Sequence, residues 1–138
     1  MSREFDPKTF PIGVIGLGMM GSSIAVCMLI AGHPVTGVEL VEGALEDAKL
    51  RIKGHFKLAE EKGLLNGPTE DYLKNLHVSS DLSTLKDCQL VIESIKEDIN
   101  IKGDVFKAVD KIVAKDAFIT SNTSAIPISD LQVFVSNP

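Results

Sequence analysis

Three glycines in the segment VIGLGMMG have the types and spacing to bind a phosphate group. Gly16, Gly18 and Gly21 form Gly-x-Gly-x-x-Gly between an apolar run at 12–15 and a stretch of helix-forming residues at 19–31. In this context the first glycine permits a sharp turn, the second leaves room for a pyrophosphate, and the third lets helix and strand pack closely. The N–H groups of the first helical turn would then face the phosphates. We therefore expect a dinucleotide to contact the whole loop: Gly16, Leu17, Gly18, Met19, Met20 and Gly21.

An acidic residue follows at the distance that dinucleotide binding requires. Glu39 ends a second apolar run at 35–39, 18 positions after Gly21. A carboxylate there can accept hydrogen bonds from both hydroxyls of an adenosine ribose, whereas it would repel a 2′-phosphate. No Arg or Lys stands near it in the sequence, so we expect NAD rather than NADP. The plainer alternatives are a tight turn without a ligand and a solvated acid at a strand end.

Two later segments should lie at the same edge of the sheet. Ligands of parallel sheets bind beyond the carboxyl ends of the strands, and the predicted fourth and fifth strands are followed by ESIKED (93–98) and SNTS (121–124). Both segments are rich in ionisable or small polar groups. Lys102, five positions after Glu97, falls in the first turn of the next helix and could reach back to the same cleft. Helix caps and surface turns are the alternative interpretation.

These motifs need a parallel sheet to bring them together, and the chain alternates short apolar runs with helical patterns as such a sheet does. We predict a Rossmann-type, doubly wound, mainly parallel α/β fold, with an extended helical pair between the second and third strands. The expected strands are 12–15, 35–39, 77–79, 90–92 and 118–120. The expected helices are 19–31, 41–62, 69–76 with Thr69 as N-cap, 100–113 and 127–134.

Length and composition narrow the function further. The chain has 138 residues, 44% of them hydrophobic, and a net charge of −5. It should form one domain, 1–138, without a basic face for nucleic acid. Cys27 and Cys88 lack metal-ligand spacing and are predicted to be reduced core residues of a cytoplasmic protein without a metal. The start has no signal-peptide pattern, and glycines interrupt the longest uncharged stretch, so no membrane association is expected.

Taken together, VIGLGMMG, Glu39, VIESIKED followed by Lys102, and SNTS resemble the NAD-binding domain of the 3-hydroxyacyl-CoA dehydrogenases. The resemblance covers the chain from Ile12 onward. It implies oxidation of an L-3-hydroxyacyl-CoA to the 3-ketoacyl-CoA with hydride transfer to NAD, in fatty-acid β-oxidation or butanoate metabolism.

The resemblance also implies roles for individual residues. The loop Gly16 to Gly21 would bind the pyrophosphate and Glu39 the adenosine ribose, while Glu97 and Lys102 would contact the cofactor. Ser124 would hydrogen-bond the reacting oxygen of the substrate, with Asn122 shaping the same turn. Lys53 is a weaker candidate for contact with a CoA phosphate. Glu39 stands where an aspartate is commoner in the family, which is a mild departure.

The general base that this chemistry needs is a histidine, and none of the three histidines fits. His33 and His77 are expected at the amino end of the sheet and His55 on the polar side of the long helix, as surface or packing residues. The resemblance places the catalytic histidine, its partner acid and an all-helical domain that forms a homodimer beyond Pro138. We therefore expect a truncated chain that binds NAD and catalyses little or nothing.

Three other functions remain open from the sequence. A sugar-acid dehydrogenase of the gulonate dehydrogenase and lambda-crystallin type shares the scaffold. The 6-phosphogluconate and β-hydroxyacid dehydrogenases share the glycine loop, although VIESIKED and SNTS weigh against them. A non-catalytic NAD-binding module is the alternative from another class.

Overall fold

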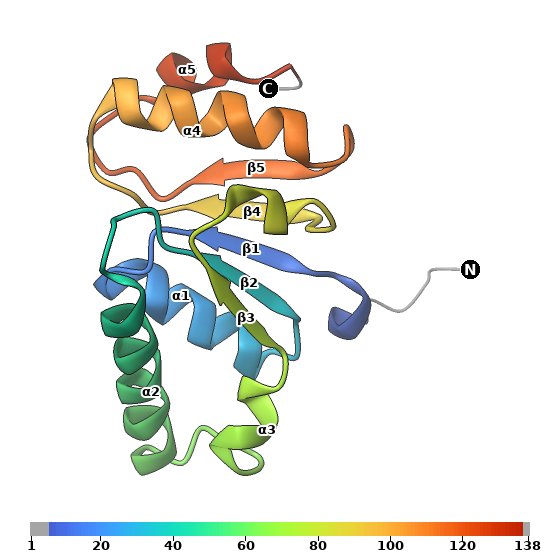
Figure 1. Ribbon diagram of the computed structural model, residues 1–138. Helices are drawn as coiled ribbons and strands as arrows, with labels where there is room; N and C mark the ends of the chain where they lie inside the picture. Colours follow the sequence, from blue (N-terminus) through green and yellow to red (C-terminus); the bar gives the residue numbers. More distant parts are fainter. Residues whose placement is uncertain (1–5, 137–138) are drawn as a thin grey trace.

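The chain forms a five-stranded parallel sheet with helices on both faces, seen in a computed structural model that describes residues 6–136 (Figure 1). The strand order is β3-β2-β1-β4-β5. The strands are β1 (Ile12–Ile15), β2 (Val35–Val38), β3 (Leu76–Ser79), β4 (Leu90–Glu93) and β5 (Phe118–Ser121). The helices are α1 (Met19–Ile30), α2 (Leu45–Glu61), α3 (Thr69–Leu73), α4 (Ile99–Ile112) and α5 (Ile128–Leu131). This is the predicted doubly wound fold, and the strand order reverses between β1 and β4.

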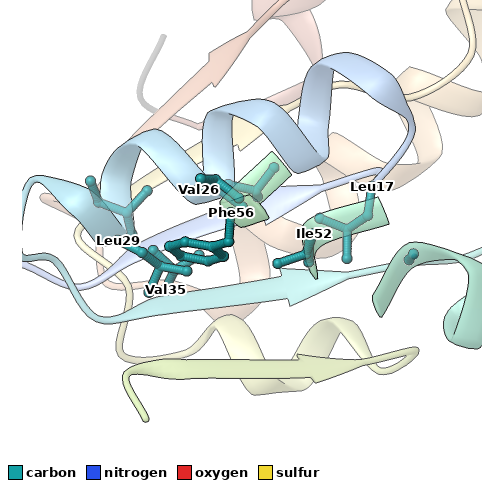
Figure 2. Close-up of a cluster of buried hydrophobic side chains, with 10 residues drawn as sticks. Leu17, Val26, Leu29, Val35, Ile52 and Phe56 are labelled. Carbon is teal, nitrogen blue, oxygen red and sulfur yellow. The ribbon is translucent and has the colours of Figure 1, made fainter. Parts of the chain in front are cut away.

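Each face of the sheet has its own apolar core. Helices α1 and α2 cover one face, and α4 covers the other (Figure 1). The apolar stripe of α2, including Ile52 and Phe56, packs against α1 and β2, and Figure 2 shows these two side chains beside Leu17, Val26 and Val35. Four-residue spacing places such a stripe on one side of a helix. The first core therefore packs α2 against α1 and against Leu17 in the loop before it.

Local signals set the helix ends that matter for the site. The Asp98 carboxylate accepts hydrogen bonds from the N–H groups of Asn100 (2.9 Å) and Ile101 (3.1 Å), which caps α4. Gly32 has a φ of 101°, as expected for a glycine just after a helix. Gly32 thus follows the end of α1, and the Asp98 cap starts α4 directly after the loop that leaves β4.

Some predicted boundaries were wrong for local reasons. Helix α2 begins at Leu45 rather than at 41, because residues 41–44 form a turn that contains Gly43 at φ 78°. Thr69 is the first residue of α3 and not its N-cap, since Pro68 occupies the cap position with extended backbone. The helix also ends at Leu73, earlier than predicted.

The two cysteines differ in their surroundings. Cys88 is buried, and burial raises the pKa of its thiol, whereas Cys27 is exposed on the outer side of α1. The prediction that both belong to the core was wrong for Cys27. Within residues 6–136, no helix combines the length and apolar character needed to cross a membrane.

Candidate functional site

The glycine loop joins β1 to α1 and leaves open space at one position only. Gly16 has a φ of 87°, and a Cβ on it would lie 2.4 Å from the Ser94 carbonyl oxygen. A Cβ on Gly21 would lie 1.7 Å from the Gly16 carbonyl oxygen, so no side chain fits there. At Gly18 a Cβ would meet nothing within 4 Å. The outer glycines therefore serve packing, while Gly18 leaves the space that a pyrophosphate needs at the start of a helix.

Glu39 follows β2 directly and lies beside this loop. It is only 9% exposed, and its Oε2 accepts a 2.7 Å hydrogen bond from the Leu17 N–H group. Its own N–H group donates to the Ser79 carbonyl at 3.0 Å, which fixes the backbone at the end of β2. A carboxylate has about four acceptor positions, so this contact leaves capacity for ribose hydroxyls. The geometry fits the diphosphate and ribose of a dinucleotide.

Two side chains of α2 also reach the loop, and the sequence analysis missed both. Arg51 Nη1 donates to the Leu17 carbonyl at 2.5 Å, and His55 Nε2 lies 3.0 Å from the Ser22 hydroxyl. Arg51 therefore bonds the carbonyl group of the residue whose N–H group bonds Glu39, and His55 is half-buried rather than on the solvent side. Their positions directly before Ile52 and Phe56, at the border of the apolar stripe, were the signal that could have identified them.

A buried ion pair lies where β4 ends. Glu93 and Lys102 have fully buried side chains, and Lys102 Nζ lies 2.6 Å from Glu93 Oε2. The same carboxylate accepts hydrogen bonds from the Ile95 N–H group (2.6 Å) and the Ser121 hydroxyl (2.5 Å). Glu93 therefore joins β4, its following loop, β5 and α4. No spacing in the sequence distinguished it from the other acids of ESIKED.

Glu97 extends this network to the segment after β5. Its Oε1 lies 3.0 Å from Lys102 Nζ, and its Oε2 accepts hydrogen bonds from the Thr123 hydroxyl (2.7 Å) and the Ala125 N–H group (3.3 Å). The bond from Thr123, and next the bond from Lys102, hold the pKa of Glu97 below its ordinary value. The Asn122 N–H group donates to the Glu93 carbonyl at 2.8 Å. The two predicted segments are thus brought together.

The remaining candidates fall into three places. Ser124 and Asn122 are exposed at this edge of the sheet, whereas the Lys102 side chain is fully buried beneath it, between Glu93 and Glu97. His33 is buried, with Nδ1 2.8 Å from the Phe10 carbonyl oxygen, as expected for a packing histidine. Lys53 is exposed near the middle of α2, beside a hollow of about 340 Å³ that reaches β3.

Comparison with known families identifies this arrangement. Residues 11–138 match the family described as "3-hydroxyacyl-CoA dehydrogenase, NAD binding domain". The chain belongs to this family. As an NAD-binding domain of the 3-hydroxyacyl-CoA dehydrogenases, it has NAD as its cofactor, and the open space at Gly18 with Glu39 beside it fits that nucleotide.

Three relatives of this 3-hydroxyacyl-CoA dehydrogenase domain are each about twice as long as this chain. This chain is 36% identical over 129 residues to the 3-hydroxybutyryl-CoA dehydrogenase of Mycobacterium tuberculosis. The alignment covers 92% of this chain and 45% of that protein. The crystal structure of M. tuberculosis FadB2 superposes with a TM-score of 0.85 at 36% identity, with 92% and 45% coverage. A 5-formyl-3-hydroxy-2-methylpyridine 4-carboxylate 5-dehydrogenase of Mesorhizobium japonicum is 30% identical, with 92% and 41% coverage. The chain therefore spans less than half of these relatives.

The dehydrogenase domain should prefer NAD to NADP because of Glu39. We expect Glu39→Ala to weaken NAD binding about 10- to 100-fold, since hydrogen bonds to a charged group contribute roughly 1.5–3 kcal/mol. Calorimetric titration of the chain with NAD and with NADP measures this. Glu42→Ala, which removes an exposed acid three residues later, is the matched control and should bind NAD normally. Equal affinity of the unaltered chain for both nucleotides would contradict the role of Glu39.

Proposed function

We propose that this chain is the cofactor-binding part of an L-3-hydroxyacyl-CoA dehydrogenase, which oxidises the 3-hydroxyl group of an acyl-CoA to a ketone. The single observation that supports this most strongly is the family match over residues 11–138. The joined segments ESIKED and SNTS support it at the level of the site, because they present polar side chains next to the position of the cofactor. Catalysis by the whole protein requires residues outside this chain.

The residues of the chain would contribute binding and orientation. Bound NAD accepts the hydride of the substrate. The N–H groups at the start of α1 would hold the diphosphate, and Glu39 would accept hydrogen bonds from the adenosine ribose. Glu97, held by Lys102 and Thr123, would fix the loop that faces the nicotinamide half. Ser124, exposed at the end of the same loop pair, would donate its hydroxyl hydrogen to the reacting oxygen of the substrate, with Asn122 shaping the turn.

A general base must remove the hydroxyl proton as the hydride leaves. None of the three histidines is suited to this step. His33 is engaged with the Phe10 carbonyl, His55 with Ser22, and His77 is exposed on β3. We propose that the base, its partner acid and the groups that form a homodimer belong to a following domain.

The substrate class is tested with the whole parent protein. We expect it to reduce NAD with 3-hydroxybutyryl-CoA and not with gulonate, and the 138-residue chain to be at least about 10²-fold slower, since loss of the acid–base group alone has that effect. Absorbance of NADH measures both. Oxidation of gulonate, or of an aromatic aldehyde such as the formylpyridine named for the M. japonicum relative, would overturn the acyl-CoA assignment. A parent protein that binds NAD and oxidises none of them would favour a non-catalytic module.

The state of the two cysteines bears on the cellular location. Cys27 and Cys88 are both free thiols, and Cys27 is exposed. Free exposed thiols are typical of reducing compartments. We propose a cytoplasmic location on this ground.

A further inference from the structure

Two neighbouring carbonyl groups of the glycine loop are linked to side chains of α2, the first directly and the second through Ser22 of α1. Arg51 Nη1 donates to the Leu17 carbonyl at 2.5 Å. The Gly18 carbonyl accepts a 2.5 Å hydrogen bond from the Ser22 hydroxyl, which in turn lies 3.0 Å from His55 Nε2. Arg51 and His55 are four positions apart, so they project from the same side of α2 on successive turns. Helix α2 thus bonds the loop directly at Leu17, and it contacts the Ser22 hydroxyl that bonds the next carbonyl group.

The hydrogen positions in the second contact follow from the chemistry of serine. A hydroxyl carries one proton, and the short contact to the Gly18 carbonyl requires it, because a carbonyl oxygen can only accept. The Ser22 oxygen must then accept from His55, so Nε2 is the protonated ring nitrogen. His55 therefore donates to Ser22, and the Ser22 hydroxyl donates to the Gly18 carbonyl.

Holding these two carbonyl groups also sets the direction of two N–H groups. In a planar trans peptide the C=O and N–H bonds point in opposite directions. The Leu17 carbonyl shares its peptide unit with the Gly18 N–H group, and the Gly18 carbonyl shares its unit with the Met19 N–H group. The Leu17 carbonyl points to Arg51 of α2, so the Gly18 N–H group points away from Arg51. The Gly18 carbonyl points to Ser22 inside α1, so the Met19 N–H group points out of the start of that helix. N–H groups at the start of a helix have no partner within the helix and are the groups that bind anions.

The helix that supplies these contacts is itself fixed in place. Ile52 and Phe56, the residues after Arg51 and His55, have exposed fractions of 1% and 0% and pack beside Leu17 and Val26 (Figure 2). Glu39 holds the other side of Leu17 through the N–H group at 2.7 Å. The Leu17 residue is therefore held at both its N–H and its C=O group.

We infer that Arg51 and His55 are positioning residues that pre-orient the glycine loop for the diphosphate of NAD. Neither needs to touch the nucleotide. Arg51 acts on the Leu17 carbonyl directly, and His55 acts on the Gly18 carbonyl through Ser22. The inference rests on the proposed role of the loop as the diphosphate site.

A double-mutant cycle on the 138-residue chain tests the His55 part. We expect His55→Leu and Ser22→Ala each to weaken NAD binding about 3- to 10-fold by calorimetry, from the loss of one hydrogen bond. The double variant should be no weaker than the weaker single variant, because both changes interrupt one chain of hydrogen bonds. His55→Gln, whose amide N–H₂ group can donate at a similar reach, should recover most of the affinity. Additive losses, or no recovery with glutamine, would overturn the inference.

Arg51 is tested with a matched lysine on the same helix. Arg51→Met should weaken NAD binding about tenfold, because it removes a charged donor and keeps the apolar stem. Lys57→Met removes a positive charge from an exposed position of α2 and should change affinity less than about twofold. Equal losses in both would show that net charge is responsible and would overturn the inference. A loss for NADP larger than that for NAD would mean that Arg51 touches the nucleotide, which also overturns it.

Hydrogen exchange without nucleotide separates this inference from the cofactor assignment. The Leu17 and Ser22 N–H groups donate to Glu39 and Gly18, respectively. We expect them to exchange faster in Arg51→Met and His55→Leu while amides of β1 keep their rates, which shows that the fold is intact. Unchanged rates at Leu17 and Ser22 would overturn the inference. If the chain bound no NAD, the cofactor assignment would fail, and these rates would still decide whether α2 orients the loop.

Discussion

Replacing Lys102 with methionine is expected to lower the free energy of unfolding by roughly 3–5 kcal/mol, because removal of one partner strands a buried charge. The Glu93 carboxylate is fully buried and would keep only the donors at Ile95 and Ser121. Glu97 is partly exposed and would lose Lys102 while it keeps the hydrogen bonds from Thr123 and Ala125. Urea unfolding with linear extrapolation measures the change.

Two variants show whether the buried charge is responsible. Lys111→Met changes an exposed lysine near the end of α4 and should cost less than about 1 kcal/mol. Adding Glu93→Gln to Lys102→Met removes the stranded charge while keeping an acceptor for Ser121, so part of the lost stability should return. A Lys102→Met variant as stable as Lys111→Met would contradict a structural role for the pair. Loss of NAD affinity in a stable Lys102→Met variant would instead indicate that the pair matters for the cofactor through Glu97.

The buried pair illustrates what the sequence could not predict. Lys102 was identified from its spacing to Glu97, and the two groups are in contact. Glu93 was missed, because its role depends on Ser121, a residue 28 positions away that pairs with it across β4 and β5. A strand-end acid looks the same in the sequence whether it faces water or a buried lysine. Pairing across the sheet decides between these, and it depends on the whole fold.

The glycine loop could be predicted from local sequence, whereas its contacts with Arg51 and His55 depend on the whole fold. The turn, the strand before it and the helix after it are local, so the place of the glycines between β1 and α1 was predicted correctly, as was the place of Glu39 after β2. Their contacts with NAD stay predictions. Arg51 and His55 reach the loop only because the apolar stripe of α2 turns their side of the helix toward α1. The contact of Arg51 with Leu17 was not expected from the sequence for this reason. Distance along the chain is a poor guide to charge around a site.

The three glycines of the loop should differ sharply in what an added methyl group does. Gly21→Ala is expected to destabilise the chain by about 3 kcal/mol or more, at the upper end of overpacking effects. Its Cβ would lie 1.7 Å from the Gly16 carbonyl oxygen, and this neighbour is backbone, which cannot move aside by a change of rotamer. Helix α1 would have to shift away from β1, and the N–H groups at its start would leave their positions. Urea unfolding and calorimetric titration with NAD should both show the loss.

Gly18→Ala and Gly54→Ala are the matched controls for this substitution. An added Cβ meets nothing within 4 Å at either position. Gly54→Ala, in the interior of α2, should stabilise the chain by roughly 0.5–1 kcal/mol and leave NAD binding unchanged, because alanine is the better helix former. Gly18→Ala should keep its stability within about 0.5 kcal/mol and still lose NAD affinity, since the methyl group would occupy the space left for the diphosphate. Normal NAD binding by Gly18→Ala would place the diphosphate elsewhere, while a stable Gly21→Ala would mean that the close approach of α1 to β1 is not required for the fold.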